Sequence, residues 1–583
     1  MFWHLKPPAP EEFIKQFPEY SPIALRLLFE RGLTTRISID EFFSPDYNED
    51  LHDPFLMLGM KEAVKRVLKA IDKKEKIAIF GDYDADGVCG AVILKSVLEI
   101  LGVKEKEIEI YIPDRNREGY GLNLEAVKKI AEQKIDLIIT VDCGITDFEE
   151  IELANSLGVE VIITDHHLVA AKLPKAKIII NPWQKKDNYP FKELAGAGVA
   201  FKLAQGLLKK TKAEIPAGWE KWLLDLVALA TVADCVPLLG ENRTLVRYGL
   251  IVLAQTQRIG LKELMEIARL NPIFEAETLT TNLDSYSLGF ILAPRLNAAG
   301  RLEHAAVGFK LLTTEDPAEA KILAKKIDSQ NRQRQKITDE IVAEVEKRAK
   351  DYLTSENQPV IVERDAAWSP GLVGLAAGKI TDRYHRPAVI FSQKENGFLR
   401  GSVRSISGFN IVEALEECAD LIGEFGGHAA AAGLSLEDKN YLLFKERINQ
   451  IARRKLKKED LIPQLEIDSE VQPEEINWEL FDSLTRFEPF GQRNKEPKFL
   501  VRDLRIVNCR MVGNGQKHLK LELKSDRMPG KIFKAIGFGL ANGQNNNLKT
   551  GDKVDLVFEL LADEWNGNKE LQMKMLDIHK TMC

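Results

Sequence analysis

Five short apolar runs, separated mostly by amphipathic helical stretches, constrain the fold of the first third of the chain. They are rich in isoleucine and valine and have the length of strands: residues 76–80, 108–113, 136–142, 159–165 and 176–181. Stretches such as "LNLEAVKKIAEQ" and "DFEEIELANSLG" lie between them. Strands that alternate with helices predict an α/β fold with a doubly wound parallel sheet. Ligands of such sheets bind beyond the carboxyl ends of the strands.

Side chains suited to metal binding follow several of these runs: Asp82, Asp84 and Asp86 in "GDYDADG", Asp142 in "VDCG", and Asp165, His166 and His167 in "TDHH". The apolar helical stretch "WLLDLVALATVADCVPL" adds Asp234 near its end. Carboxylates this close together repel one another unless a cation lies between them. Carboxylate oxygens with imidazole suit Mn²⁺ or Mg²⁺ better than zinc. The number of carboxylates suggests two ions that share a bridging ligand.

Two other interpretations of the acidic motif are weaker. A calcium loop that starts at Asp82 needs a glutamate at its twelfth position, which is Ile93, and it should follow a helix rather than a strand. A single aspartate at a strand end often caps the next helix, but several carboxylates with a histidine pair at one sheet edge are harder to explain in this way. Cys89, Cys143 and Cys235 adjoin proposed ligands, and we expect them to be small apolar filler.

Composition indicates a globular protein of several domains. The chain has 583 residues, of which 45% are hydrophobic and 29% are charged. It contains no run of 18 apolar residues, and its N-terminus lacks the regions of a signal peptide, so we expect no membrane association. Six scattered cysteines without a C-x-x-C motif favour a reducing compartment, and we expect a cytoplasmic protein. The net charge of −7 means that any nucleic-acid-binding surface must be local.

Motifs along nearly the whole chain resemble one known family. "DYDADG", "VDCG", "DHH" and "ADCVPL", in this order, resemble the four motifs of the DHH phosphoesterase superfamily. "GGHAAAAG" (426–433) is similar to the glycine-rich signature of the associated DHHA1 domain. "APRLNAAGRL" (293–302) and "PFGQRNKEP" (489–497) resemble the bacterial single-stranded-DNA-specific exonucleases of the RecJ family, which degrade DNA in the 5′→3′ direction.

The resemblance implies a two-metal phosphodiesterase in which water is the nucleophile. Two divalent ions, Mn²⁺ or Mg²⁺, are its implied cofactors. The implied metal ligands are Asp84, Asp86, Asp142, His166 and Asp234. Asp142 would bridge the ions, His167 would face the scissile phosphate, and Asp82 would either contact a metal or orient the loop. Small-molecule relatives carry a further histidine ligand where this chain has Phe80.

The resemblance also implies which residues bind the substrate. Arg115, Ser402 and Arg404 would hold the 5′-terminal phosphate and thereby fix polarity. Further substrate contacts are expected from Arg295, Asn297, Arg301 and His428. His428 is the only bulky side chain of "GGHAAAAG", so backbone amides there could approach a phosphate closely.

We expect five parts in the chain: an N-terminal extension (1–50), a DHH catalytic domain (51–240), a helical connecting region (241–353), a second α/β domain of DHHA1 type (354–460) and a C-terminal β-barrel of OB type (461–583). The connecting region should contain one long helix, or two joined ones, within 316–353. Between residues 498 and 534 there are ten Lys or Arg and three Asp or Glu. A basic barrel with Phe499, Phe533 and Phe538 suits single-stranded nucleic acid, although each of these rings, taken singly, is expected in the core rather than in a stacking platform.

These observations predict a metal-dependent 5′→3′ exonuclease that hydrolyses single-stranded DNA in repair and recombination. The alternative is a DHH-family phosphoesterase that acts on oligoribonucleotides or cyclic dinucleotides. The long insert and the basic barrel argue against that alternative, because a small substrate needs neither. By resemblance, a single-stranded-DNA-binding protein and a RecQ-type helicase are expected partners of a monomeric enzyme.

Overall fold

A computed structural model describes residues 1–115, 117–393, 397–541, 547–565 and 568–581. The chain divides into two compact units. One contains residues 47–236 and 241–462, and the other contains residues 1–46, 237–240 and 463–583. Within the described ranges, no helix combines the length and the hydropathy that a membrane span requires.

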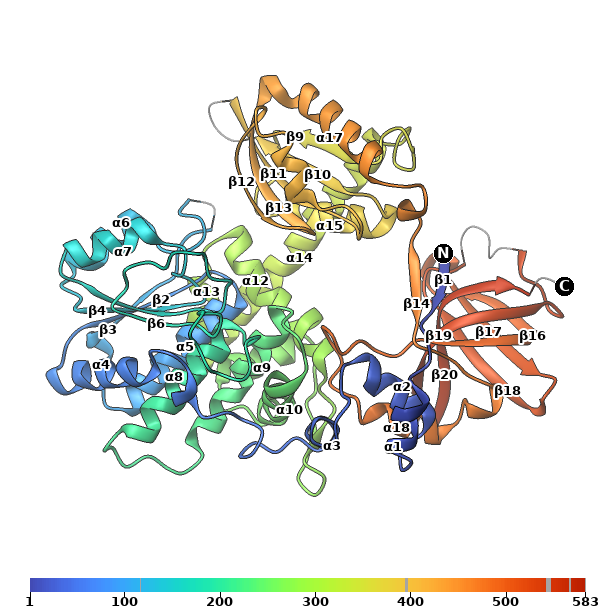
Figure 1. Cartoon of the computed structure of the whole chain (residues 1–583), viewed down its shortest axis with the longest axis horizontal. Coiled ribbons are helices and arrows are strands. Elements are labelled where there is room, and N and C mark those ends of the chain that lie inside the picture. The colour runs from blue at the N-terminus through green and yellow to red at the C-terminus, as the bar shows by residue number, and fades with distance from the viewer. Residues whose placement is uncertain (116, 394–396, 542–546, 566–567, 582–583) are drawn as a thin grey trace. The chain divides into compact units, whose positions relative to one another are not determined.

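The larger unit begins with the predicted parallel sheet, drawn in blue to cyan in Figure 1, and its strand order is β3-β2-β4-β5-β6. All five predicted strands form: β2 (Ile77–Gly81), β3 (Ile108–Tyr111), β4 (Leu137–Val141), β5 (Glu160–Thr164) and β6 (Ile178–Ile180). Helices α6 (Leu124–Glu132) and α7 (Phe148–Ser156) share one apolar cluster with Ala78, Phe80 and Ile138. The sheet therefore has the doubly wound architecture that the sequence predicts.

Helices also pack against one another in this unit. Helix α5 (Ala85–Ile100) contacts α8 (Gly196–Lys210) and α9 (Leu224–Ala233). Both α5 and α9 are buried along most of their length, which explains why their sequences are apolar on all sides. The C-terminal end of β2, the start of α5 and the end of α9 carry the acidic motifs, so this packing positions the candidate site.

The predicted long helix is a single one, α14 (Pro317–Arg348). The Asp316 side chain caps it by accepting a hydrogen bond from the backbone N–H of Ala318, and Pro317 occupies its first turn. Its sequence contains no glycine and no further proline, which permits a helix of 32 residues. It contacts α11 (Ile259–Ile267), α12 (Ala293–Leu302) and α15 (Val373–Tyr384).

A second sheet follows, with the order β12-β13-β11-β10-β9. Its strands are β9 (Ile361–Asp365), β10 (Ala388–Gln393), β11 (Phe398–Arg404), β12 (Ile422–His428) and β13 (Ala431–Glu437). Only the pair of β9 and β10 is parallel. Along β11, buried residues alternate with Arg400, Ser402 and Arg404, so these three side chains lie on the same face of the sheet.

The smaller unit contains the predicted barrel. Its strands are β16 (Phe499–Val512), β17 (His518–Ser525), β18 (Met528–Gly537), β19 (Lys553–Trp565) and β20 (Asn568–Lys580). Pairing of β16 with β19 closes the five strands into a barrel. Phe499 and Phe533 are buried in its core, whereas Phe538 is exposed and packs edge-on against His518. Of the three predicted stacking rings, only Phe538 is available to a ligand.

The N-terminal residues belong to the same unit as the barrel, an association that the sequence did not predict. Strand β1 (Phe2–Leu5) pairs in parallel with β14 (Gln464–Ile467). The Trp3 ring stacks on His579 with centroids 4.1 Å apart, and its indole N–H donates to Asp577 at 2.9 Å. Helices α1 (Glu11–Gln16), α2 (Pro22–Glu30) and α3 (Arg36–Phe43) add apolar side chains to the core of the barrel.

Candidate metal and phosphate site

The acidic loop connects β2 to α5. Asp84 is the N-cap of α5, and its Oδ1 accepts hydrogen bonds from the backbone N–H groups of Asp86 and Gly87 at 2.9 and 3.2 Å. A Cβ at Gly87 would lie 2.5 Å from the Asp82 nitrogen, so only glycine allows the loop to close this tightly. Capping therefore fixes the loop and leaves Oδ2 of Asp84 for another partner.

The carboxylate of Asp86 is held by the beginning of α8. Its two oxygens accept hydrogen bonds from the backbone N–H groups of Gly196 and Ala197, each at 2.7 Å. A Cβ at Gly196 would lie 2.6 Å from the Cβ of Asp142, so the absence of a side chain lets this helix end approach both acids. The positive end of the helix dipole also favours a carboxylate here.

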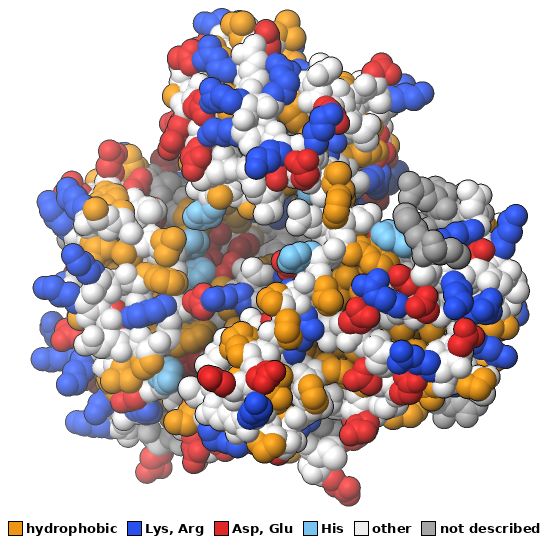
Figure 2. Space-filling view, turned by 45° about the vertical axis from the view of Figure 1, so that its right-hand side comes forward, with side chains coloured by type: hydrophobic (Ala, Val, Ile, Leu, Met, Phe, Trp, Pro, Cys, Tyr) orange, Lys and Arg blue, Asp and Glu red, His pale blue; other side chains and the backbone are white. Residues whose placement is uncertain are grey.

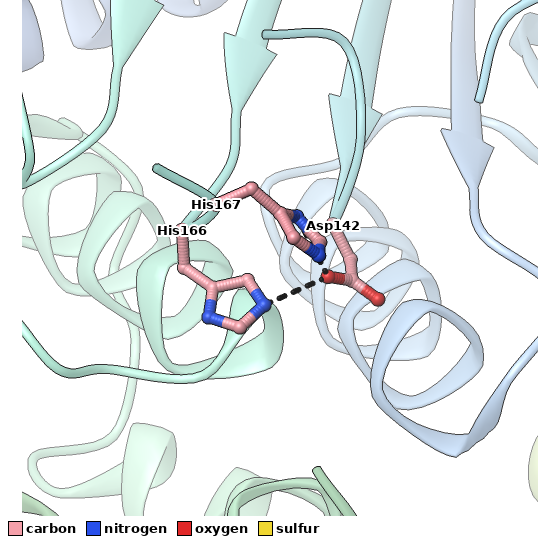
Figure 3. Close-up of side chains that lie close together, drawn as sticks. All are labelled: Asp142, His166 and His167. Carbon is pink, nitrogen blue, oxygen red and sulfur yellow. Dashed lines mark ion pairs between the residues drawn. The ribbon is translucent and has the colours of Figure 1, made fainter. Parts of the chain in front are cut away.

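Asp142 and both histidines converge at the ends of β4 and β5, and both imidazole rings point toward the Asp142 carboxylate (Figure 3). His166 Nε2 lies 3.1 Å from Asp142 Oδ1, 3.6 Å from Asp234 Oδ2 and 3.8 Å from Asp86 Oδ2. Asp142 has a backbone φ of 61°, in the left-handed region that aspartate tolerates better than most residues. Strained backbone of this kind is common at functional sites.

Asp165, the first residue of "DHH", orients His167. It is fully buried, and its Oδ1 lies 2.8 Å from Nδ1 of His167, while its Oδ2 accepts from the backbone N–H of Ile145. The charge and hydrogen bond of His167 outweigh burial and hold the pKa of Asp165 below its usual value. An ionised carboxylate only accepts, so Nδ1 of His167 carries the proton.

Tyr120 is a member of the site that the sequence analysis did not identify. Its hydroxyl donates to the carbonyl oxygen of Asp142 at 2.9 Å and lies 3.1 Å from Nδ1 of His167. It belongs to the loop between β3 and α6, together with Arg115. A tyrosine in a loop gives no periodic signal, and only the fold brings it to the ends of β4 and β5.

Burial and mutual repulsion perturb the acids strongly. Burial, followed by the charge of Asp84, raises the pKa of Asp86 to about 7. Burial, followed by the charges of Asp86 and Asp84, raises the pKa of Asp234 to about 8. The pKa values of Asp82 and Asp142 also lie well above the usual range, for the same two kinds of reason. Such clustered shifts are typical of functional sites.

The two histidines are perturbed in opposite directions. Burial, with the nearby positive charge of His167, lowers the pKa of His166 to about 4. Burial also disfavours a charged His167, but the hydrogen bond and charge of Asp165 outweigh it and raise the pKa of His167 to about 9. At neutral pH one ring is a neutral lone-pair donor and the other is a cation.

The residues fit divalent metal ions. Three sets of side chains each bring potential ligand atoms within 4.8 Å of one another: Asp82 with Asp84 and Asp142, Asp86 with His166 and Asp234, and Asp142 with both histidines. Asp82 Oδ1, Asp142 Oδ1 and His166 Nε2 are buried without a hydrogen-bond partner. Acidic and histidine side chains gather in a hollow of the surface (Figure 2). Oxygen ligands with imidazole are the donor set that Mn²⁺ and Mg²⁺ accept.

The position of Phe80 supplies no ligand. Its ring is buried and stacks on Tyr111 with centroids 5.1 Å apart. Cys89 and Cys143 are also buried, and burial raises the pKa of both thiols well above the usual value. A thiol whose pKa is raised in this way stays protonated at neutral pH. These two cysteines therefore act as packing groups beside the acids.

The predicted phosphate-binding residues come from two domains of the larger unit. Ser402 and Arg404 project from β11, and Arg404 Nη1 lies 3.4 Å from Ser402 Oγ. A Cβ at Gly374, in the first turn of α15, would lie 2.8 Å from Ser402 Oγ, so this helix end adjoins the same group. Burial, followed by the positive charge of Arg115, lowers the pKa of Arg404. The guanidinium groups of Arg115 and Arg404 therefore lie close enough for their charges to repel each other.

The remaining predicted substrate residues have different surroundings. Asn297 Oδ1 accepts from the backbone N–H of Ala85 at 2.7 Å, so it braces the acidic loop. Arg301 donates to the carbonyl oxygen of Gly371 at 3.0 Å, and burial, followed by the charge of Arg115, lowers its pKa to about 9. Arg295 pairs with Asp328 at 3.0 Å, and His428 is an exposed residue at the end of β12.

Family models match three parts of the chain. Residues 76–231 match the model of the DHH family N-terminal domain, residues 357–457 match the DHHA1 domain, and residues 467–577 match the RecJ OB domain.

Two relatives with similar sequences are named single-stranded-DNA-specific exonuclease RecJ. The chain is 40% identical to the single-stranded-DNA-specific exonuclease RecJ of Bacillus subtilis, over 99% of this chain and 70% of the relative. It is 36% identical to the Escherichia coli protein of that name, over 88% and 89% of the two chains.

Solved structures are similar over the whole chain. The RecJ of Thermus thermophilus in complex with Mn²⁺ matches with a TM-score of 0.82 at 28% identity, and the match covers 100% of this chain and 80% of that one. The Mg²⁺ complex matches with a TM-score of 0.76 at 27% identity, over 100% and 79% of the two chains. The chain belongs to the RecJ family of single-stranded-DNA-specific exonucleases.

Proposed function

We infer that this chain is a metal-dependent 5′→3′ exonuclease that hydrolyses single-stranded DNA in repair and recombination. The observation that carries the inference is the cluster of buried carboxylates around His166, with three ligand atoms that lack hydrogen-bond partners. Similarity to RecJ proteins over the whole chain gives the substrate.

The proposed metal ligands are Asp84, Asp86, Asp142, His166 and Asp234, with Asp142 as the bridge. Asp82 belongs to one of the three metal-competent sets, which supports it as a further ligand. When bound, two divalent ions would generate a hydroxide from water at neutral pH and neutralise charge on the attacked phosphate. The chain's own contribution is to fix two of these carboxylates: backbone N–H groups of α5 hold Asp84, and those of α8 hold Asp86.

We propose that His167 contacts the scissile phosphate rather than a metal. Its Nδ1–H is engaged by Asp165, which leaves Nε2 for the substrate. The raised pKa of about 9 keeps the ring protonated at neutral pH, and a protonated ring can donate a charge-assisted hydrogen bond to a phosphate oxygen. Tyr120 would help to hold the ring in place, because its hydroxyl lies beside Nδ1 and is anchored on Asp142.

The polarity of hydrolysis is proposed to come from Arg115, Ser402 and Arg404. The N-terminal end of α15, where Gly374 allows close approach, would add backbone N–H groups to these side chains. Bound there, a terminal 5′-phosphate would hold the strand so that the first phosphodiester reaches the acidic cluster. We propose Asn297 as the brace of the acidic loop, and Arg295, Arg301 and His428 as further contacts to the strand.

Further proposals concern partners and location. Single-stranded DNA is the macromolecular substrate, and the OB-type barrel is a second place for it to bind. We propose a single-stranded-DNA-binding protein and a RecQ-type helicase as partners by family resemblance, and a monomeric, cytoplasmic enzyme. Scattered cysteines without a C-x-x-C motif support the location.

The function is tested by incubating end-labelled strands with the protein and Mn²⁺. A 5′-labelled DNA strand should release its label at once as a short product, whereas a 3′-labelled strand should shorten progressively. Single-stranded RNA and a cyclic dinucleotide, tested in parallel, should be poor substrates. Preferential hydrolysis of the cyclic dinucleotide would support the alternative phosphoesterase, and early release of the 3′ label would contradict the polarity.

A further inference from the structure

We propose that Tyr286 and Phe290 form a stacking platform for bases of the single strand, beside the acidic cluster. The proposal rests on the proposed function, because it concerns how the strand of that substrate approaches the centre. The two side chains are 59% and 71% exposed. Their rings lie parallel to each other, with centroids 5.0 Å apart and an interplanar angle of 17°.

Tyr286 and Phe290 are not the residues by which this helical segment packs against the rest of the protein. Ser287, Leu288 and Leu292, in the same helical segment, are buried, so its apolar side is already covered by the protein. Isolated apolar side chains are common on protein surfaces, but these two exposed rings are stacked on each other and form a short aromatic column. The outer ring face of such a column is suited to a ligand that is itself flat and aromatic.

The segment that carries Phe290 is a π-helix, η4 (Ser287–Leu292), which leads directly into α12. Short π-helical segments occur frequently at functional sites. Its Gly289 packs against α9: a Cβ there would lie 3.1 Å from a methyl carbon of Val232. Val232 precedes Asp234 by two residues, so this contact packs η4 against the end of α9 that leads into an acid of the cluster.

One side of the continuous helix connects the two rings to that cluster. Tyr286, Phe290, Pro294, Asn297 and Arg301 follow one another at spacings of four, four, three and four residues. Helical residues at these spacings lie on one side. At the far end of this side, Asn297 accepts a hydrogen bond from Ala85, in the acidic loop. Phe290 precedes Asn297 by a helical rise of about 10 Å.

These relationships identify the occupant as bases of the substrate strand. A strand whose terminal phosphodiester lies at the acidic loop must leave the centre, and this side of the helix leads outward from it. Every base has an aromatic face, so stacking holds the strand without reading its sequence. The platform would therefore add affinity for strands of more than a few nucleotides and would leave the hydrolytic step to the acidic cluster.

The first experiment compares the wild type with the double variant Tyr286→Ala/Phe290→Ala. Its binding to a single strand, measured without divalent ions so that no hydrolysis occurs, should be about 5- to 100-fold weaker, because loss of base–aromatic stacking has an effect of this order. With Mn²⁺, KM should rise while kcat stays within about twofold. The matched control is Leu442→Ala/Leu443→Ala, which shortens two exposed apolar side chains of α17 (Tyr441–Lys455). This control should change neither the affinity for the single strand nor KM.

A second experiment distinguishes stacking from other contacts. A single abasic nucleotide is moved along the strand, and binding of each strand is measured. The wild type should bind more weakly when the abasic nucleotide lies within one short interval near the 5′ end. The alanine variant should show no such loss of affinity. Tyr286→Leu/Phe290→Leu, which keeps apolar area but removes the rings, should behave like the alanine variant, whereas Tyr286→Phe/Phe290→Tyr should behave like the wild type.

The proposal is overturned if the alanine variant binds and degrades long strands as well as the wild type does. That outcome would indicate that the two rings bind a protein partner instead of bases. The proposal is also overturned if the leucine variant retains full affinity. Failure of the proposed function has a different signature, since wild-type protein with Mn²⁺ would then leave single-stranded DNA intact. The thermal unfolding midpoint of each variant confirms that the exposed substitutions have not altered the fold.

Discussion

His166 Nε2 lies 3.1 Å from Asp142 Oδ1, and both atoms are buried without a hydrogen-bond partner. The pKa of His166, lowered to about 4, means that the ring is neutral at pH 7, so Nε2 can offer a lone pair. A lone pair and a carboxylate oxygen repel each other at this distance unless a proton or a cation joins them. The relationship between these two residues is the structural basis for a metal centre.

The first prediction concerns pH and stability of the metal-free protein. The pKa of Asp234 is raised to about 8, above the value near 3.9 of an unfolded aspartate. The folded state therefore binds more protons than the unfolded state between these values, and the contribution of this residue to stability falls as pH rises from about 4 to 8. Asp234→Asn removes the ionisation and should become progressively more stable than the wild type across that window.

Thermal unfolding in a chelator at pH 5, 7 and 9 measures this difference. Mn²⁺ should stabilise the wild type more at pH 8 than at pH 6, because metal ions displace protons from the ligands. Asp147→Asn is the control for the effect of Mn²⁺, because Asp147 lies outside the metal-competent sets. The pKa of its carboxyl is also raised, to about 6, chiefly by burial. A wild type that gains stability relative to Asp234→Asn as pH rises would contradict the electrostatic account.

The second prediction concerns the 5′-phosphate. Arg404→Ala should reduce the preference for 5′-phosphorylated over 5′-hydroxyl strands by about 10- to 100-fold, the range expected for a lost hydrogen bond between charged groups. Steady-state hydrolysis of the two strands gives the ratio. Arg400 lies on the same strand and the same face as Arg404 and is exposed, so Arg400→Ala is the matched control. An unchanged ratio in Arg404→Ala would mean that the phosphate is bound elsewhere.

The third prediction concerns the barrel. Arg510 and Lys520 are direct neighbours on β16 and β17, and like charges in this position destabilise a sheet unless an anion lies over them. Replacing both with alanine should reduce the slope of log affinity against log salt by about 1.4, since each neutralised phosphate of a single strand contributes about 0.7. Hydrolysis of very short strands should not change.

The control for this prediction removes the same charge from another part of the molecule. Lys61 and Lys65 are exposed on α4 (Met60–Lys73). Their replacement by alanine should leave the salt slope for a long strand unchanged. Equal slopes for the wild type and the barrel variant would exclude these two barrel residues from DNA binding.

The parallel sheet could be predicted because its signal is local. Strands such as β4 (Leu137–Val141) are buried at every residue, so four of its five side chains are apolar, and helices with one polar side separate these strands. Parallel strands end at the same edge, which brings Asp84, Asp142 and His166 together whatever the detailed packing. The long helical segment of α14 could also be predicted, because no glycine or additional proline interrupts it, but the sequence left open whether it forms one helix or two joined ones.

Other parts of the site depend on contacts that no local pattern encodes. The backbone N–H groups that hold Asp86 come from Gly196 and Ala197, more than a hundred residues later in the chain. Tyr120 lies in a loop, and its hydroxyl contacts Nδ1 of His167, a residue 47 positions later in the chain. Strand β1 pairs with β14, and the first three helices pack against the apolar core of the barrel; neither association is evident in the sequence of either partner.

The most direct test counts manganese ions bound per chain by equilibrium dialysis, with hydrolysis of a 5′-phosphorylated single strand measured in the same samples. The wild type should bind two ions, and hydrolysis should appear only as they bind. Asp142→Asn should lose at least one ion and its hydrolysis, while its folded structure remains intact, because the shared ligand is gone. Two ions bound with wild-type affinity and near-normal hydrolysis in Asp142→Asn would contradict the bridging role and, with it, the proposed centre.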